Sequence, residues 1–250
     1  MSKLYVVSVG RNAGKFVLNC VKSVAKQTLK PDSHILVDDI SDDDTRLYLK
    51  SLPTNGLTEV IFNTERKYRA KNIYDNAINK NSEDIICIVD NDDWLNQVTA
   101  LEEIKEIYSK SQNLEFVYTN YIFSSGERGN NQAIPDKNWN PYTGRWITSH
   151  MCTFKVKALQ RVALSNFLDS DGKWFQIATD HALTLPMLYK SREIHGDYSA
   201  VRFLDKVFYH YLLDGNPSKP RNGPEAQERA KMAGFNSNYI RNRGYVEDPS

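Results

Sequence analysis

Residues 1–122 alternate between short apolar runs and segments whose apolar residues recur at helical spacing. Five runs rich in β-branched residues have the length of buried strands: 4–9, 34–37, 59–62, 85–89 and 116–121. The segments between them that predict helices are 16–24, 45–52, 70–79 and 97–109. Because strand–helix alternation is typical of βαβ units, the sequence predicts an α/β fold with a mostly parallel sheet covered by helices on both faces.

The pattern is less regular in the second half of the chain. Residues 124–140 form a loop rich in Gly and Asn. Two strands and two helices are expected after it, at 148–154 and 201–213 and at 155–164 and 180–191 respectively. Pro186 should disturb the last of these helices. From residue 216 onward the sequence is rich in Pro, Asn, Arg and Gly, which indicates a C-terminal tail or a lid.

Charge and hydropathy exclude several classes of protein. Thirty-two Lys and Arg against 31 Asp and Glu give a formal net charge of +1, so nucleic acid is not an expected partner. The longest apolar runs, such as 85–89, are far too short for an integral membrane segment, and no signal-peptide stretch follows Met1. The three cysteines are widely separated and form no CxxC motif. We therefore expect reduced thiols and a cytoplasmic protein.

Acidic side chains follow two of the predicted strands at the point where each strand ends. Asp38 and Asp39 come after one strand, and Asp90 and Asp92, two residues apart, come after another. Ligands of such sheets bind at the carboxyl ends of the strands, and Mg²⁺ or Mn²⁺ is typically held by one or two carboxylates together with substrate phosphates. A metal site is therefore one interpretation of Asp90 and Asp92. The other is a solvated acidic turn in which Asp93 caps the next helix.

Several blocks in the first hundred residues occur in the order found in a known family. They are Val7–Asn12 (VSVGRN), Ser23–Thr28 (SVAKQT), Val37–Thr45 (VDDISDDDT), Arg69–Asn72 (RAKN) and Val89–Trp94 (VDNDDW). Together they resemble the opening of family 2 glycosyltransferases of the GT-A fold. The chain departs from the family pattern at Gly10 and Arg11, where Thr-Tyr is usual, and at Ile40, which replaces a turn glycine.

The second half resembles the same family at two places. Thr179-Asp180-His181 is similar to the element whose aspartate serves as the catalytic base. Lys206–Tyr211, with Ser218 beyond it, is similar to the closing strand and loop, although Leu212 stands where an arginine is usual.

The resemblance implies a donor site at the ends of the strands. Its nucleotide- and diphosphate-binding residues are Val9, Arg11, Asp38, Asp39, Arg69, Asp90 and Asn91. Because side chains alternate at a strand end, only one of Asp38 and Asp39 is expected to face the ligand. Asp90 and Asp92 are the implied ligands of Mn²⁺ or Mg²⁺, with His210 as a candidate third ligand. The alternative for Arg69 is a solvated charge at a helix end, and for His210 a packed histidine in a strand.

Asp180 is the implied general base of transfer with inversion. Such a reaction needs a carboxylate to take the proton of the acceptor hydroxyl while the anomeric carbon is attacked from behind. The alternative is a helix N-cap, since Asp180 begins the helix expected at 180–191. The two roles are compatible because a helix N-terminus favours an ionised carboxylate.

The sequence and the resemblance together predict an inverting, metal-assisted glycosyltransferase that uses a nucleoside-diphosphate sugar, a UDP-sugar first of all, and a glycan or other hydroxyl acceptor. Its fold should be α/β of the Rossmann-like GT-A type, with a mixed, mostly parallel sheet. A domain at 1–215 would comprise a nucleotide-sugar half (1–122) and an acceptor half (123–215), followed by a tail or lid at 216–250. The alternatives are a nucleotidyltransferase-like enzyme, whose triphosphate loop Gly10–Lys15 superficially resembles, and a catalytically inactive sugar-nucleotide-binding module on the same fold.

Overall fold

One mixed sheet organises the chain in the computed structural model, which describes residues 2–53, 56–213 and 223–248. Its eight strands follow the order β3-β2-β1-β4-β7-β6-β8-β5. The strands are β1 (Leu4–Gly10), β2 (Ser33–Asp38), β3 (Thr58–Phe62), β4 (Ile85–Ile88), β5 (Trp94–Leu95), β6 (Phe116–Phe123), β7 (Cys152–Lys155) and β8 (Val201–Tyr211). The helices are α1 (Val17–Ala25), α2 (Thr45–Lys50), α3 (Tyr68–Ala77), α4 (Ala100–Lys110), α5 (Val156–Gln160), α6 (Thr179–His195) and α7 (Pro224–Arg243), with short 3₁₀ helices at Gly14–Phe16 and Leu164–Phe167.

The expected mixed, mostly parallel sheet is confirmed. The pairs β1/β2, β1/β4, β2/β3 and β6/β8 are parallel, whereas β4/β7, β6/β7 and β5/β8 are antiparallel. Val7 at the centre of β1 pairs with Ile35 of β2 on one side and with Ile88 of β4 on the other. The carboxyl ends of β1, β2 and β4 therefore meet at one edge, which is where ligands of such sheets bind.

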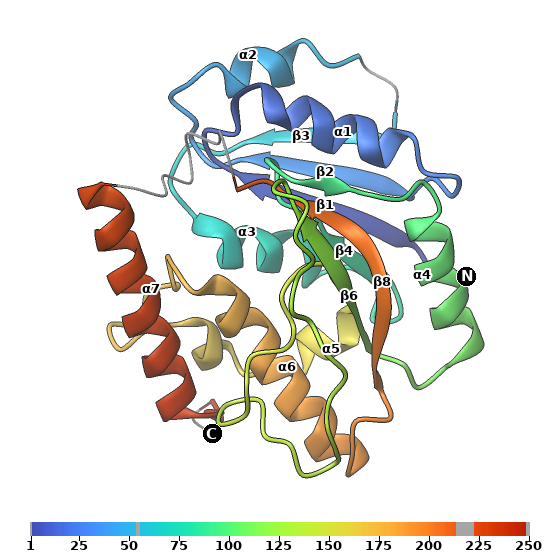
Figure 1. The fold of residues 1–250 in the computed structure, drawn as a ribbon, viewed down its shortest axis with the longest axis vertical. Helices are drawn as coiled ribbons and strands as arrows, with labels where there is room; N and C mark the ends of the chain where they lie inside the picture. The colour runs from blue at the N-terminus through green and yellow to red at the C-terminus, as the bar shows by residue number, and fades with distance from the viewer. Residues whose placement is uncertain (1, 54–55, 214–222, 249–250) are drawn as a thin grey trace.

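Two layers of helices cover the sheet, and alternation along the strands decides which residues meet which layer. Val7 and Val9 of β1 pack with α3 and α6 in one buried cluster. Leu4 and Val6 pack with α1 and α4 in another. Figure 1 shows α1 and α2 above the sheet and α3 and α6 on its other side. Because both faces are covered, the central strands are predominantly apolar, as the sequence pattern predicted.

Helix α6 runs without a break through Pro186, which we expected to disturb it. The residues around the proline, Leu185 and Met187 among them, are buried against the body of the protein. This burial holds the helix where proline removes one backbone hydrogen bond.

Helix α7 occupies much of the segment predicted as a tail or lid; residues 216–222, including Ser218, lie outside the described part of the chain. The second half of α7 is anchored: Ile240 is buried, and Arg243 Nη1 donates to Leu168 O at 2.8 Å. Few apolar residues mark the helix, so its sequence lacks a helical period, but Pro224 suits a first helical position. Within the described residues, no helix combines the length and apolar character needed to cross a bilayer.

Candidate active site

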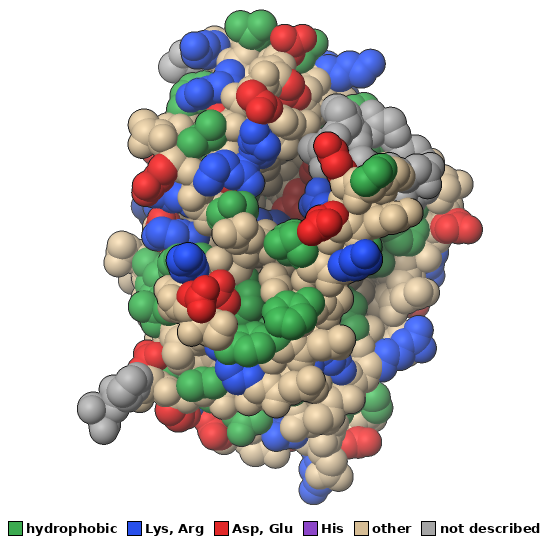
Figure 2. All heavy atoms as spheres, turned by 90° about the vertical axis from the view of Figure 1, so that its left-hand side faces the viewer, with side chains coloured by type: hydrophobic (Ala, Val, Ile, Leu, Met, Phe, Trp, Pro, Cys, Tyr) green, Lys and Arg blue, Asp and Glu red, His purple; other side chains and the backbone are tan. Residues whose placement is uncertain are grey.

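A cleft of about 880 Å³ opens at the carboxyl ends of β1, β2 and β4. It is bounded by the ends of these strands, by the turn before α6, and by the first half of α7. The sequence-predicted residues on its wall are Val9, Arg11, Asp39, Arg69, Asp90, Asp92 and Asp180. Figure 2 shows this face of the molecule, with a hollow that contains acidic side chains and is surrounded by basic, acidic and hydrophobic ones. The structure thus brings residues from both halves of the chain to one cavity.

Asn91 fixes the acidic turn that follows β4. Its side-chain nitrogen donates to Val37 O at 3.0 Å and its backbone nitrogen to Val9 O at 3.2 Å. The residue is fully buried and lies beneath the cleft wall, so it holds the turn to β1 and β2. Gly10 is part of this packing, since a Cβ at that position would lie 2.6 Å from Asn91 Cβ. Asn91 thereby presents Asp90 and Asp92 to the cleft.

Tyr209 of β8 ties the same turn to the opposite side of the sheet. Its hydroxyl accepts a hydrogen bond from Asp90 N at 3.1 Å and donates to Asp93 Oδ2 at 2.8 Å. The other carboxylate oxygen of Asp93 accepts from Leu212 N at 2.8 Å. Burial, followed by the charges of Asp93 and Asp90, raises the pKa of Tyr209 well above its usual value, so the hydroxyl remains a donor. Asp93 therefore serves the end of β8 and not as the cap of a following helix.

Arg69 of α3 connects the turn after β4 with α6. Its Nε lies 2.7 Å from Asp90 Oδ1, and its Nη1 lies 2.6 Å from Asp180 Oδ1. The Arg69 side chain is only 19% exposed, against 41% for Asp180. Such short, charge-assisted bonds are among the strong hydrogen bonds of proteins. Arg69 is therefore a mostly buried partner of two carboxylates, and not the solvated charge at a helix end that was the alternative for it.

Asp180 lies in the first turn of α6 and does not cap it. The N-cap position is Ala178, and no side chain makes a capping hydrogen bond there. The carboxylate of Asp180 instead reaches Arg69 and the cleft. A negative charge in the first turn of a helix is favoured by the helix dipole, which helps to keep the carboxylate ionised.

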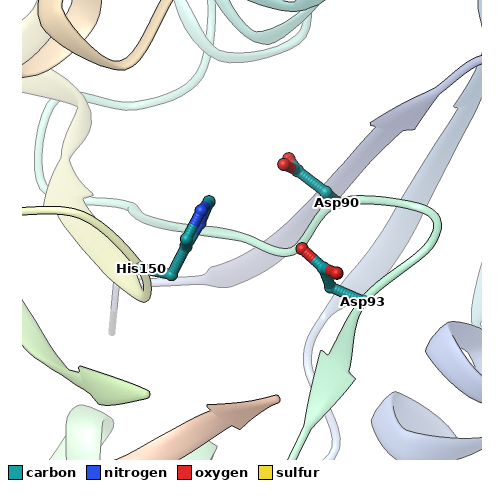
Figure 3. Close-up of side chains that lie close together, drawn as sticks. All are labelled: Asp90, Asp93 and His150. Atoms are coloured by element: carbon teal, nitrogen blue, oxygen red, sulfur yellow. The ribbon is translucent and has the colours of Figure 1, made fainter. Parts of the chain in front are cut away.

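His150 is the histidine that the structure brings to the carboxylates. Asp90, Asp93 and His150 each place one potential ligand atom within 4.8 Å of the others (Figure 3). The ring of His150 is stacked against Tyr209, at 4.9 Å between centroids, and against Tyr211, at 4.7 Å. It comes from the loop before β7, and no local sequence signal distinguishes it from the other four histidines.

His210, the candidate third ligand from the sequence, points elsewhere. Its ring is stacked on Trp94, with centroids 3.9 Å apart, and β5 pairs with β8 at these two residues. Strand alternation explains the difference, because Tyr209 and Tyr211 face His150 while His210 between them faces the other side. Burial lowers the pKa of His210, as expected of a packed strand histidine.

The two aspartates after β2 have different surroundings. Asp39 lines the cleft, where its oxygens accept hydrogen bonds from Lys67 N, Tyr68 N and Asn63 Nδ2, each at 2.9 Å. Burial would raise the pKa of Asp39, but these hydrogen bonds and the nearby Arg66 outweigh it, and the pKa is lowered. Asp38 is fully buried beneath the wall, and its carboxylate lies 3.2 Å from Arg46 Nε. Asp38 therefore supports the turn rather than the cavity.

Backbone strain is concentrated around the cleft. In the part of the chain that the structure describes, four non-glycine residues have positive φ: Asn12 (59°), Ile40 (60°), Tyr68 (61°) and Ala178 (61°). Three of them line the cavity, and the fourth, Ile40, accepts a hydrogen bond from Arg11 Nε at 2.8 Å. A β-branched residue in this region is unusual, and strained residues of this kind cluster at functional sites. Ile40 therefore adopts the left-handed conformation even without the glycine that is usual there.

Comparison with known proteins agrees with this geometry. Residues 5–172 match the family described as Glycosyl transferase family 2, whereas no curated protein sequence matches the chain. The S. aureus TarS 1-349 structure in complex with UDP-GlcNAc is similar with a TM-score of 0.61 and 16% identity, covering 93% of this chain and 66% of that one. A longer S. aureus TarS structure is similar with a TM-score of 0.58 and 17% identity, covering 84% of this chain.

The chain spans 37% of the length of that longer TarS structure. The mannosyltransferase PcManGT from Pyrobaculum calidifontis, in complex with GDP-Man and Mn²⁺, is similar with a TM-score of 0.56 and 14% identity, covering 99% of this chain and 66% of that one. At such identities the likeness shows the fold, and it confirms the expected GT-A type of sheet. Because the family match spans more than half of its length, the chain belongs to glycosyl transferase family 2.

Proposed function

We propose that the chain transfers a sugar with inversion from a nucleoside-diphosphate donor, a UDP-sugar in the first instance, to a hydroxyl of a glycan or other acceptor. The observation that carries this proposal is the bridge that Arg69 forms between Asp90 and Asp180. One guanidinium separates a carboxylate suited to the donor's metal from a carboxylate suited to accept a proton. Both substrates would then meet in a single cleft, as direct transfer between them requires.

The donor would occupy the ends of β1, β2 and β4. Val9, Arg11 and Asp39 would contact the nucleoside, with Arg66 and Arg69 as cations near the diphosphate. The similar structures hold UDP-GlcNAc, UDP and GDP-Man, which supports a nucleoside-diphosphate sugar as the class of donor. Because Asp38 and Asn91 are buried beneath the wall, we assign both a supporting role in this site.

The side chains around Asp90 fit a Mn²⁺ or Mg²⁺ ion. Asp90 and Asp92 line the cleft, and a ring nitrogen of His150 lies within 4.8 Å of a carboxylate oxygen of Asp90. Carboxylate and imidazole donors suit Mn²⁺. One carboxylate oxygen of Asp93 accepts a hydrogen bond from Tyr209 and the other from Leu212 N, so Asp93 has another task. We therefore assign Asp90, Asp92 and His150 as the ligands of the metal ion. The PcManGT structure is a complex with GDP-Man and Mn²⁺. A bound divalent cation would neutralise the charge that develops on the departing diphosphate.

Asp180 would act as the base. Its carboxylate takes the proton of the acceptor hydroxyl as the acceptor oxygen bonds to the anomeric carbon and the bond to the diphosphate oxygen breaks. The hydrogen bond from Arg69 Nη1 orients one oxygen of Asp180 and stabilises its ionised form. Attack from the face opposite the leaving group gives inversion.

Two alternatives receive less support from the geometry. A nucleotidyltransferase-like enzyme would use the loop Gly10–Lys15 for a triphosphate, but Lys15 is exposed and does not line the cleft. An inactive binding module would not need Asp180 in contact with Arg69.

We retain the proposed domain at 1–215 and a cytoplasmic location. The location is supported by Cys20, Cys87 and Cys152, which are all buried free thiols and suit a reducing compartment. For residues 216–250 the sequence offered a tail or a lid; below we make a more specific proposal for α7, which lies in this segment.

A thermal-shift screen of nucleotides and nucleotide sugars, with Mn²⁺ or with EDTA, tests the proposal directly. We expect a nucleoside diphosphate to raise Tm, more strongly with Mn²⁺, because it binds only the folded state. The matching nucleotide sugar should be hydrolysed slowly when no acceptor is present. The proposal fails if no nucleotide sugar shifts Tm and none is hydrolysed.

A further inference from the structure

One wall of the cleft is the first half of α7. Glu225, Glu228, Arg229 and Met232 line the cavity, together with Pro224 at the start of the helix. Their spacing of three and four residues places them on one side of the helix. None of the residues 224–235 is buried, so this part of α7 does not serve the core. Figure 1 shows α7 standing beside α6, at the edge of the molecule.

The second half of α7 is attached to the turn that carries Asp180. Asn236 Nδ2 donates to Ile177 O at 3.3 Å, and Ser237 Oγ lies 2.7 Å from His181 Nδ1. Burial of His181 lowers its pKa to about 4, so the ring is neutral at physiological pH. Helix α7 is therefore fixed to the residues next to the base, and its exposed half extends from them along the cavity.

Asp180 consequently lies between two different surroundings. Arg69 connects it to Asp90 and the donor side, whereas His181 and Ile177 connect it to α7. In transfer with inversion the acceptor hydroxyl must contact the base while it approaches the anomeric carbon from the face opposite the diphosphate. The side of Asp180 away from Asp90 is the side on which an acceptor fits, and α7 forms its wall.

The two sides of the cleft differ in their balance of charge. On the donor side, three arginines (Arg11, Arg66 and Arg69) are balanced by three aspartates (Asp39, Asp90 and Asp92). The wall of α7 presents two carboxylates, Glu225 and Glu228, with one guanidinium and the thioether of Met232. Carboxylates accept strong hydrogen bonds from hydroxyl groups, and a thioether packs against the apolar face of a sugar ring. The same carboxylates repel a phosphate, sulfate or carboxylate of an anionic acceptor.

We propose that the cleft-facing side of α7, formed by Glu225, Glu228, Arg229 and Met232, is the acceptor subsite, and that it takes an uncharged glycan in preference to an anionic one. This inference rests on the proposed glycosyltransferase function and specifies its second substrate. A lid whose basic side chains cover the diphosphate would be a different use of this segment. Arg241 and Arg243 could not form it as they stand, because they donate to the carbonyls of Gly144 and Leu168.

The test is binding of the full chain, loaded with Mn²⁺ and the nucleotide that stabilises it best, to a glycan array of neutral, sulfated and phosphorylated glycans. We expect the wild-type protein to bind neutral glycans at least tenfold better than their anionic counterparts. The variant Glu225→Gln/Glu228→Gln should lose about tenfold in binding of neutral glycans, because two charge-assisted hydrogen bonds become ordinary ones. A matched control, Gln227→Lys/Ala230→Lys, makes the same change of charge at exposed α7 positions outside the cleft and should bind like the wild type.

Three results would overturn the inference: a preference for anionic glycans, no binding of any glycan above background, or equal binding by the glutamine variant and the control. Failure of the proposed function looks different. It is read from the nucleotide-dependent Tm shift and the nucleotide-sugar hydrolysis of the wild-type protein, which require no acceptor. A protein that passes these two measurements and fails on the array retains its function and loses only the assignment of α7.

Discussion

Replacing Asp180 by Asn removes a negative charge and preserves the shape of the side chain. The variant loses the ion pair with Arg69 Nη1, but Arg69 keeps Asp90 as a partner at 2.7 Å, so no buried cation is left alone. A pair in which Asp180 is 41% exposed contributes roughly 1 kcal/mol, and loss of a charge in the first turn of a helix costs about 0.3–1 kcal/mol. We expect a total loss of about 1–2 kcal/mol, which lowers Tm by roughly 2–8 °C for a chain of this size.

The effect on transfer should be far larger than the effect on folding. A positioned general base is worth on the order of 10²–10⁴ in rate, so Asp180→Asn should lower kcat for transfer by that factor. Donor binding should persist, because Asp180 lies on the far side of Arg69 from Asp90. The assay is nucleotide release with and without acceptor, with Tm shifts by nucleotide and Mn²⁺ measured in parallel. Asp171→Asn, an exposed carboxylate outside the cleft, is the control for the change of charge.

Two outcomes would refute the reasoning. Transfer at a nearly wild-type rate would reduce Asp180 to a partner of Arg69 and exclude it as the base. Loss of nucleotide-dependent stabilisation would instead assign Asp180 to the donor site. Either result is distinguishable from misfolding, because a folded variant keeps a cooperative unfolding transition a few degrees below that of the wild type.

Three further predictions concern the metal, the core and the acidic turn. Asp92→Asn should reduce the nucleotide-dependent Tm shift in Mn²⁺ to its level in EDTA, and equal shifts in both conditions for the wild type would argue against a metal-bridged diphosphate. His34 is buried, with its Nε2 2.9 Å from Ser8 Oγ, and burial lowers its pKa to about 3. In the unfolded chain the pKa of a histidine is about 6.5, so the unfolded state binds the proton first as pH falls. The free energy of unfolding therefore decreases as pH falls below about 6.5. About 2 kcal/mol should be lost between pH 7 and pH 5 from this residue, and His34→Gln should flatten that slope in urea titrations; an unchanged slope would contradict it. Gly10→Ala should cost about 1–3 kcal/mol in urea unfolding because the new Cβ would lie 2.6 Å from Asn91 Cβ, and an unchanged midpoint would show that the turn can yield.

The first half of the fold was predictable because its signals are local. Buried parallel strands are mostly apolar on both faces, and the helices between them carry an apolar stripe, so β1, β2 and β4 follow from short windows of sequence. The acidic turn directly follows the apolar run of β4, so the sequence also predicts that Asp90 and Asp92 lie at the ligand-binding edge of the sheet. Helix α7 gave no such signal, since only Ile240 of its residues is buried.

The candidate site itself combines local and non-local information. Sequence alone determined the chain's family resemblance, the strand ends that carry Asp39, Asp90 and Asp92, and the helix that carries Asp180. Tertiary structure decided which of those neighbours face the cavity. It buried Asn91 beneath the wall, turned His210 away from the carboxylates and brought His150 toward them. The physical reason is that a side chain's partners depend on contacts between residues far apart in the chain: Arg69 lies 111 positions from Asp180, and no window of sequence contains both.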